Sequence, residues 1–441
     1  MPNATLPTAV VLAAVALTAP RSLAQSIGMV RLAGTPEQIG TTWGEMNKAI
    51  IAEDFETAFL KRAAKAGISK ETLLKRSEAA VRIIKEIAPH WIEEARAIAR
   101  AAGVDEDLYV AYFDSVVRSR FLHKDPDECT SYAVSPEHAD GAILFHKNRD
   151  NRDSPQAVYL VESSREGINK FIAISNATGI HGFSMMANDK GLAGSADTPG
   201  PRGKDLKPAI HQSRGIMSAT MLRYIAERAS TCREALAFIK DCVAKGWYAG
   251  GTVGGSHWLL VDREGTILEV WNNPGYVDSK VHTQKAYFSA RSDHTAARRL
   301  REAQRPVDFH LFHNVSRDRS ICFNSSIAGM TVEIDPTHPE LFTCAWISLP
   351  ASSVSFPLLM GQTSTPDCLL DGKAYRLGRT TTGKPRLWEA TERGIHESKE
   401  QLRKKVSAEL PKGDPAQTSQ ALDHWSQQQA EMLLQLLKSH Q

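Results

Sequence analysis

The stretch Cys129-Thr130-Ser131-Tyr132, followed by Asp140-Gly141 and then by Asn148-Arg149-Asp150, decides the fold of this chain. Alternating side chains on either side of Asp140-Gly141 predict two strands, over residues 131–135 and 142–147, joined as a hairpin. The hairpin places a thiol at the head of one strand and a carboxylate at the end of its partner. We therefore expect Cys129 and Asp150 to lie at the same end of the hairpin.

A cysteine in this position needs a base, because a free thiol is mostly protonated at neutral pH and only the thiolate attacks carbonyl groups well. If the backbone is cut before Cys129, its new α-amino group, with a reference pKa of about 7.7 to 8.0, can act as that base. No histidine is then required. The sequence predicts self-cleavage before Cys129, with the same sulfur serving afterwards as an N-terminal nucleophile.

Composition narrows the class of protein. The chain has 441 residues, of which 42% are hydrophobic and 23% are charged, so it can bury a full core and global disorder is excluded. Its 53 basic and 50 acidic residues give a formal net charge of +3, which leaves no excess of one sign to concentrate on phosphate. Nucleic-acid binding is not predicted.

The N-terminus has the pattern of an export signal. Residues 9–19 form an apolar run, and Ser22-Leu23-Ala24 supplies small residues at both positions that a signal peptidase reads. No later stretch reaches about 18 apolar residues, so no transmembrane helix and no stable membrane insertion are expected. We predict that residues 1–24 are removed and that the mature chain is exported, to the periplasm or the extracellular space.

Six cysteines are few for a chain of this length, and none forms a CxxC pair, so neither a disulfide scaffold nor a structural zinc site is expected. Cys232 and Cys242 lie in one predicted helix, roughly 15 Å apart along its axis, which is too far for a bridge. We interpret both as packing residues. Pairing among the other four stays open.

The segment before Cys129 has a helical pattern. Thr35-Pro36-Glu37 is a good helix start, with a hydroxyl cap, proline at the first helical position and an acid in the first turn. Apolar stripes at helical spacing continue from residue 73 to residue 101, interrupted at Pro89. Residues 25–128 are therefore predicted to form a helical pro-segment.

After Cys129 the periodicity changes to alternation, and strands then mix with paired helices. Strands are predicted over residues 158–162, 170–175, 329–334 and 341–347, hairpins at residues 189–191 and 263–265, and helices over residues 215–227, 232–245 and 293–303. This order favours an α+β layered domain over a parallel βαβ sheet. We assign it residues 129–369, followed by a helical C-terminal extension over residues 370–441.

The extension is predicted to contain helices over residues 388–410 and 417–437. Its leucine-rich end, at residues 432–437, could dock on the main domain or on a second subunit. A homo-oligomer is therefore one expectation.

Together these motifs resemble the acyl-CoA:6-aminopenicillanate (isopenicillin-N) acyltransferase family of N-terminal-nucleophile hydrolases. The resemblance spans roughly residues 32 to 334. It rests on the order and spacing of several pieces: residues 34–40 with Gly44, Ala88-Pro89-His90, residues 102–105, Cys129-Thr130-Ser131, the hairpin that ends in Asn148-Arg149-Asp150, Asn188 with Gly191 and Leu192, and Val281-His282-Thr283 with Arg298.

The resemblance implies a four-layer αββα sandwich in which Cys129 is both the autoprocessing residue and the nucleophile. It also implies that Asp150 orients the new amine or the thiol, and Arg149 is counted among the catalytic candidates. The family usually has an asparagine after Val-His-Thr that stabilises the oxyanion, but this chain has Gln284, whose amide sits on a longer arm. Two further departures are Glu128, where a glycine often precedes the cysteine, and Arg319, a loose match for a late arginine.

The function implied is cleavage or transfer at a linear amide bond through a thioester on Cys129, with no metal or cofactor. The partner would be a small-molecule amide or a peptide, and the cut pro-segment would remain associated as a small subunit. Whether the acyl group passes to water or to an amine stays open.

Three other functions are compatible with the sequence. The chain also resembles secreted dipeptidases and bile-salt hydrolases, which share Cys-Thr, a strand and Asn-Arg-Asp. It could be an inactive binding protein that retains the fold, for which Gln284 is the best support. It could also be a cysteine protease that uses a Cys and His pair without maturation, given its 15 histidines.

Individual residues also have simpler interpretations. Asp150 could belong to a solvated turn, Asn148 and Arg149 could be ordinary strand-end residues, and His146 and His282 are expected to be structural. Asn272-Asn273-Pro274-Gly275 is most simply a turn, with a site role for Asn273 left open.

Overall fold

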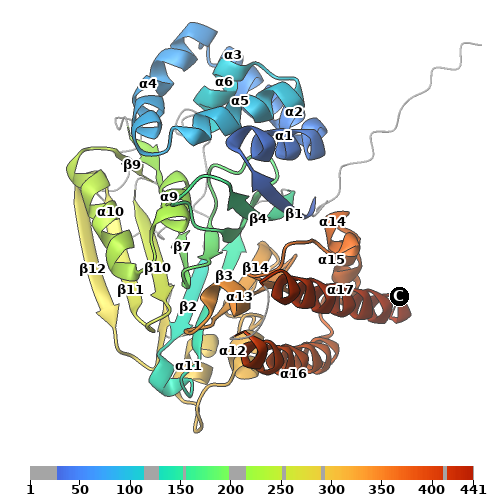
Figure 1. The fold of residues 1–441 in the computed structure, drawn as a ribbon. Helices are drawn as coiled ribbons and strands as arrows, with labels where there is room; N and C mark the ends of the chain where they lie inside the picture. Colours follow the sequence, from blue (N-terminus) through green and yellow to red (C-terminus); the bar gives the residue numbers. More distant parts are fainter. Residues whose placement is uncertain are drawn as a thin grey trace, which may run out of the picture.

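Two stacked β-sheets form the centre of the protein in the computed structural model, which describes residues 27–113, 129–151, 155–197, 215–250, 255–289, 294–410 and 415–440 (Figure 1). The first sheet has the strand order β1-β4-β5-β6-β7-β10-β11-β12 and the second the order β13-β2-β3-β14-β15-β16. The strands of the first sheet are β1 (Ile27–Gly34), β4 (Gln156–Ser163), β5 (Phe171–Asn176), β6 (Met185–Asn188), β7 (Leu192–Asp197), β10 (Ser256–Asp262), β11 (Ile267–Asn273) and β12 (Tyr276–His282).

The strands of the second sheet are β2 (Thr130–Val134), β3 (Ile143–Asp150), β13 (Ala286–Phe288), β14 (Ser326–Ile334), β15 (Cys344–Ser348) and β16 (Phe356–Leu359). A separate pair joins β8 (Ile216–Met217) to β9 (Tyr248–Gly250). Apart from β1 with β4 and β8 with β9, the paired strands are antiparallel. The α+β layered domain predicted from the alternation of strands and helices is confirmed.

The predicted hairpin between β2 and β3 is confirmed. Asp140 and Gly141 take φ values of +52° and +83°, the left-handed region in which Asp and Gly are tolerated. The register then places Thr130 opposite Asn148. Cys129, one residue before Thr130, and Asp150, two residues after Asn148, therefore lie at the same end of the second sheet.

Helices cover the outer face of each sheet. On the first sheet lie α9 (Ser218–Arg228) and α10 (Cys232–Ala244), which Figure 1 shows against β7, β10 and β11. On the second lie α11 (Thr295–Arg301) and α12 (Phe309–Val315), with α16 (Pro385–Glu409) beyond α12. The predicted four-layer αββα arrangement is confirmed; α12 was not predicted.

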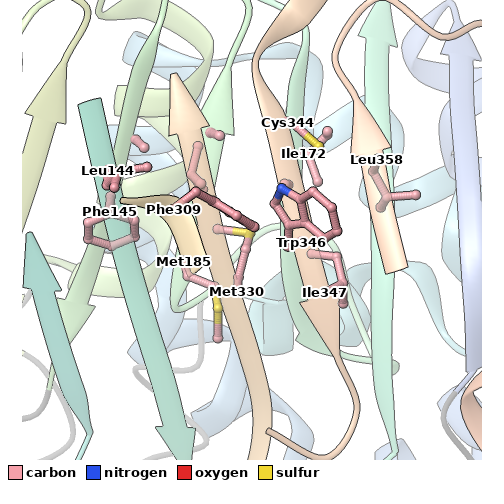
Figure 2. Close-up of a cluster of buried hydrophobic side chains, with 14 of the residues drawn as sticks. Leu144, Phe145, Ile172, Met185, Phe309, Met330, Cys344, Trp346, Ile347 and Leu358 are labelled. Atoms are coloured by element: carbon pink, nitrogen blue, oxygen red, sulfur yellow. The ribbon is translucent and has the colours of Figure 1, made fainter. Parts of the chain in front are cut away.

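One hydrophobic cluster unites side chains from both sheets with the helices over the second sheet. Ile172 and Met185 come from the first sheet, and Phe145, Met330 and Trp346 from the second (Figure 2). All five side chains are fully buried. Burying each such side chain contributes about 1.5 to 3 kcal/mol, so this layer is a main source of stability.

The N-terminal segment differs from the prediction at its start. It opens with β1, which pairs in parallel with β4, Leu32 lying opposite Val161, so the segment is not helical throughout. The helices then follow: α1 (Pro36–Met46), α2 (Lys48–Asp54), a π-helix (Phe55–Leu60), α3 (Lys61–Lys65), α4 (Lys70–Ile87), α5 (His90–Ala102) and α6 (Glu106–Phe113). Thr35 caps α1 in a capping box with Gln38, as the start signal predicted.

A buried ionic cluster joins this segment to the two-sheet core. Arg223 of α9 is fully buried between Glu94 of α5, at 2.7 Å, and Glu227 of α9, at 2.9 Å. His90 and Trp91 of α5 reach Glu227 at 2.9 and 3.0 Å. Because a buried charge is costly without its partner, α5 and α9 depend on each other.

The C-terminal extension contains α14 (Asp367–Leu370), α15 (Lys373–Gly378), α16 and α17 (Pro415–Ser439). The two long helices predicted there are confirmed. Glu392 of α16 is bound by Arg317 at 2.6 and 2.9 Å, which ties the extension to the core. The strand predicted over residues 341–347 is in part α13 (Pro339–Phe342), because Pro339 begins a helical turn before β15.

All six cysteines are free thiols, and Cys232 and Cys242 are buried as predicted. Within the described ranges, no helix combines the length and the apolar character needed to cross a membrane. The predicted export signal, residues 1–24, lies outside the described residues.

Candidate active site

Cys129 lies immediately before β2, at the end of the second sheet where β3 ends, and is half-buried. Side chains alternate along a strand, so Cys129 shares a face with Ser131, whose hydroxyl meets Ser195 of the first sheet at 2.6 Å. The sulfur therefore faces the interior between the sheets. Burial raises the pKa of the thiol, an effect that Lys147 opposes and that Asp197 and Asp150 reinforce. A thiol in this setting stays protonated unless a base is supplied.

Lys147 is a cation that acts on the Cys129 thiol and that the sequence did not single out. It lies opposite Ser131 in the β2–β3 register, is fully buried, and pairs with Asp197 at the end of β7. Its ammonium also donates to the carbonyls of Ser184 and Ala196, both at 3.3 Å. The signal that could have found it was a lysine inside a predicted strand, two residues after the apolar run at residues 143–145, because lysine is almost never buried without a partner.

Asp197 completes this pair. Burial opposes its ionisation, but Lys147, His257 and the hydroxyl of Ser131 outweigh that cost and hold the pKa of the carboxyl below its usual range. The ion pair places a fixed cation beside the thiol. Lys147 lowers the pKa of the Cys129 thiol and Asp197 raises it by less, so the ion pair offsets only part of the effect of burial.

Asp150 ends β3 at the level of Cys129 and is buried. Its backbone makes a hydrogen bond to the Cys129 sulfur, and its carboxylate accepts a short hydrogen bond from Ser326 of β14. The solvated turn that the sequence allowed as an alternative is therefore wrong for Asp150. The structure brings this carboxylate to the region of the nucleophile.

Asn148 and His146 act as structural residues. The amide of Asn148 donates to the carbonyls of Ser316 and Ile321 at 2.7 and 3.0 Å, and its oxygen contacts His146 Nε2 at 2.8 Å. Burial lowers the pKa of His146 to about 3, so this ring is neutral. Both residues hold the chain that follows α12 against β3.

Arg149 faces the interior of the sandwich, on the same face of β3 as Lys147. Its guanidinium crosses to the first sheet and donates to Gln156 Oε1 at 2.5 Å, and Gln156 in turn donates to Asn176 at 3.0 Å. Arg149 is half-buried. On this face Lys147 thus reaches β7 and Arg149 reaches β4.

Gln284 is not brought to Cys129, which corrects the expected oxyanion donor. It lies in an exposed bend between β12 and β13. Ala286 pairs with Val134, and Lys285 accepts from Ser135, so Gln284 is at the far end of β2, roughly 20 Å from Cys129 at 3.3 Å per residue. The sequence could not reveal this, because the register between β13 and β2 is set by tertiary pairing.

The side-chain amide of Asn273 lies nearer than that of Gln284 to the end of the sandwich that holds Cys129. His257 pairs with both Asp197 and Trp271, so Asn273, two residues after Trp271, lies on the interior face at the end of the sheet that holds Asp197. The amide of Gly275 donates to Asn273 Oδ1 at 3.0 Å, which orients the side chain and leaves its NH2 group as a donor. The turn predicted at residues 272–275 is confirmed.

A second polar cluster lies deeper between the sheets. Glu269 receives His257 at 2.8 Å, His282 at 2.7 Å and Trp271 at 2.6 Å, together with the Tyr287 hydroxyl. Burial opposes its charge, but these donors keep the pKa of Glu269 below its ordinary range. His282 Nε2 is thus engaged by Glu269 in a structural contact. Over the described part of the chain, no histidine is hydrogen-bonded to Cys129.

One group of possible metal ligands occurs among the described residues, formed by Glu333, His396 and Glu400 within 4.8 Å of one another. Lys399 already binds both Glu333 and Glu400. An ammonium therefore occupies the position that a metal ion would need. These residues attach α16 to β14.

Comparison with known proteins finds one sequence family and several solved structures that are similar to this chain. A family model described as acyl-coenzyme A:6-aminopenicillanic acid acyl-transferase matches residues 137–311, a stretch that begins after Cys129. No curated protein matches the chain.

Among solved structures, penicillin V acylase from Agrobacterium tumefaciens is 14% identical, covering 53% of this chain and 86% of that one, with a TM-score of 0.37. A variant of the conjugated bile acid hydrolase from Clostridium perfringens is 13% identical, covering 54% and 94%, with a TM-score of 0.37. The resemblance to the acyl-CoA:6-aminopenicillanic acid acyltransferase family, predicted from the order and spacing of several sequence motifs, is thus confirmed over residues 137–311.

Proposed function

We propose that the chain is an autoprocessed hydrolase or acyltransferase that acts on linear amide bonds through Cys129. The observation that carries this proposal is the register of β2 and β3, which sets Cys129 beside the Asp150 backbone and near the buried Lys147. The family match over residues 137–311 supports the same reaction class. Metals and cofactors have no role in the proposal.

The reaction begins after the peptide bond before Cys129 has been broken. The freed α-amino group takes the thiol proton, and the sulfur attacks the amide carbonyl. When the carbon–nitrogen bond breaks, the ammonium returns a proton to the leaving amine and a thioester remains. Water or an acceptor amine then attacks the thioester, which releases a carboxylic acid or a new amide and restores the thiol.

Each neighbour has a part in this scheme. Burial of the thiol makes a base necessary, and Lys147 favours the thiolate once the proton has left. Asp150 orients the α-amino group. Asn273 takes the oxyanion role first expected of Gln284, a donor worth about 3 kcal/mol in other enzymes.

The N-terminal segment remains bound after the cut in this proposal. β1 is hydrogen-bonded to β4, and Glu94 with His90 completes the buried cluster around Arg223. Loss of the segment would leave Arg223 without one of its two carboxylates. We further propose export with removal of residues 1–24, as the sequence predicts.

Mass spectrometry of the purified protein under denaturing conditions tests the proposal. We expect two fragments, the larger beginning at Cys129, together with amidase activity. Cys129→Ala should give an uncut, inactive chain, because one sulfur serves both maturation and catalysis. The matched control is Cys368→Ala, which removes a thiol of α14 in the C-terminal extension and should process normally.

Other outcomes select the alternative functions. An intact chain with strong amidase activity would favour a Cys and His protease, and an intact inert chain would favour a binding protein. If the protein is cut, activity on dipeptides or on conjugated bile acids would identify a dipeptidase or a bile-salt-hydrolase-like enzyme. Processing in Cys129→Ala would reject the nucleophile.

A further inference from the structure

We propose that β12 is the interface of a homodimer, in which the β12 strands of two copies of this chain pair antiparallel about a two-fold axis at Ser279. The partner is therefore a second copy of the chain. This inference does not depend on Cys129 or on the proposed reaction. It assigns a role to an edge of the first sheet that the reaction does not use.

The open position of β12 is the first argument. The strand ends the order of the first sheet, and Figure 1 shows it at the left border of the molecule. Among the described residues its only strand partner is β11, and α10 packs on one of its faces. The opposite edge of this sheet differs, because α14 packs closely against β1, where a Cβ on Gly28 would lie 2.0 Å from the carbonyl oxygen of Leu369.

The backbone of β12 offers hydrogen bonds to another strand. A two-residue turn joins β11 to β12, and the pair that flanks such a turn exchanges both backbone hydrogen bonds. Because hydrogen-bonded pairs alternate along an antiparallel ladder, Val277, Ser279 and Val281 direct their N–H and C=O groups away from β11. In agreement, the Ser279 N–H donates to the Asp278 carboxylate at 2.9 Å and not to β11.

The charges on β12 complement those of a second copy. Antiparallel pairing centred on Ser279 sets Asp278 of each copy opposite Lys280 of the other, so the contact forms twice. Both side chains are exposed, and neither has an ion-pair partner in the part of the chain that the structure describes. Side chains at such non-hydrogen-bonded positions lie closest together. Pairing centred on Asp278 or on Lys280 would instead bring like charges together, so the charges select one register.

Exposed apolar side chains follow the same edge. Val281 is 57% exposed and Tyr276 is 53% exposed. In the proposed register Val281 lies opposite Val277 of the second copy, and Tyr276 lies opposite its His282. Dimerisation would therefore remove both apolar side chains from water, which is the main favourable contribution to association.

The helix layer leaves room for this pairing. α10 packs on both β11 and β12, so it lies about one strand spacing from the proposed axis. The α10 helices of two copies would then be about 10 Å apart, which is two strand spacings. Packed helices are usually separated by about 8 to 10 Å, so the two helices would contact each other without a clash.

Sedimentation velocity of the purified protein, over about 1 to 100 μM, tests the inference. The mass of one copy is taken from mass spectrometry under denaturing conditions, as the sum of its fragments if the chain is cut. We expect a dimer in the upper part of this range, with twice the mass of one copy. A protein that stays monomeric at the highest concentration would overturn the interface.

Charge reversal tests the register. Asp278→Lys and Lys280→Asp each set like charges opposite each other at two positions, so each should raise the Kd of the dimer by at least about tenfold. An equimolar mixture of the two variants restores opposite charges at both positions and should dimerise like the wild type. Restored association in the mixture is not expected if either substitution acts only by disturbing the fold of its own chain.

An apolar substitution tests the location. Val281→Asp places a charge opposite the partner's Val277 and should give a monomer. The matched control is Met432→Asp, because Met432 is a comparably exposed apolar side chain, 45% exposed, in the leucine-rich end of α17. This variant should dimerise like the wild type. Thermal unfolding of each variant verifies that it is folded.

The remaining outcomes decide against the inference. A dimer that survives in both Asp278→Lys and Val281→Asp overturns it. A dimer that Met432→Asp abolishes and Val281→Asp preserves also overturns it, because the interface would then lie on α17. If Lys280→Asp does not fold, Asp278→Lys and Val281→Asp still decide.

Discussion

The thiol of Cys129 lies among charges of both signs, and their balance sets its reactivity. Burial and two carboxylates raise its pKa, while Lys147 lowers it. Because the buried ion pair with Asp197 holds the Lys147 ammonium in place, this ammonium stays near the sulfur when the sulfur becomes charged. Preorganised charge of this kind acts without any reorganisation at the moment of reaction.

Asp150→Asn should slow amide cleavage by at least tenfold, equivalent to about 1.4 kcal/mol of barrier, because an amide cannot hold the α-ammonium group as a carboxylate does. Steady-state rates of the processed enzyme give the measurement. Asp189→Asn, at the half-buried turn between β6 and β7, is the control and should be neutral. An unchanged rate in Asp150→Asn would place this residue outside the site.

Lys147→Met should destabilise the protein by about 3 to 5 kcal/mol, because it leaves Asp197 buried with no cation. Urea unfolding of the uncut or processed protein measures the loss. The double variant Lys147→Met with Asp197→Asn removes both charges and should recover most of it. A single variant as stable as the wild type would contradict the assignment of this pair.

At the scale of elements, the crossing of α1 and α5 depends on a glycine. A Cβ on Gly40 would lie 2.4 Å from the Glu94 carbonyl oxygen and 2.8 Å from Ala97 Cβ. On Gly394, within α16, a Cβ would meet nothing within 4 Å. A side chain therefore has no room at Gly40 and open space at Gly394.

Substitution by alanine should have opposite signs at these two sites. Gly394→Ala should raise the free energy of unfolding by up to about 1 kcal/mol, the difference in helix propensity. Gly40→Ala should lower it by about 1 to 3 kcal/mol, because overpacking forces the helices apart. Thermal unfolding of both variants checks this, and stabilisation by Gly40→Ala would contradict the close packing of α1 on α5.

Local elements could be predicted from the sequence, and long-range pairings could not. The β2–β3 hairpin followed from Asp140-Gly141, and α1 followed from Thr35-Pro36, since both signals act over a few residues. The strand β1 was missed because its parallel partner, β4, lies more than a hundred residues away. For the same reason the sequence did not reveal the Lys147–Asp197 ion pair and wrongly placed Gln284 beside Cys129. The neighbours of these three residues depend on the register between strands that are distant in the sequence.

At the scale of the whole molecule, buried titratable groups should make stability depend on pH. Burial lowers the pKa of His146 to about 3. Burial opposes ionisation of Glu227, but Arg223, His90 and Trp91 outweigh it and hold its pKa at about 2. In both cases the unfolded state binds more protons, so stability falls as the pH falls, from about 6.5 for His146 and from about 4.5 for Glu227.

We therefore expect the free energy of unfolding to drop by about 2 kcal/mol between pH 7 and pH 5 through His146, with a further loss below about pH 4.5 from Glu227. Urea titrations at several pH values measure both stages. His146→Gln should remove its share of the first stage and leave the second, while His181, His310 and His313, whose pKa values burial also lowers, keep the rest of the first stage. A curve that is level from pH 7 to pH 5 would show that His146 is not kept neutral.

The strand β1 has a consequence for how the protein can be handled. It is the outermost strand of the first sheet, so it shields a row of β4 peptide groups from solvent and from other chains. Any truncation that begins after residue 34 would expose this row, and bare strand edges recruit copies of themselves. Preparations that lack β1 should accordingly precipitate or form ordered aggregates. Co-expression of the N-terminal segment with the fragment that begins at Cys129 would then be the practical way to obtain that larger fragment.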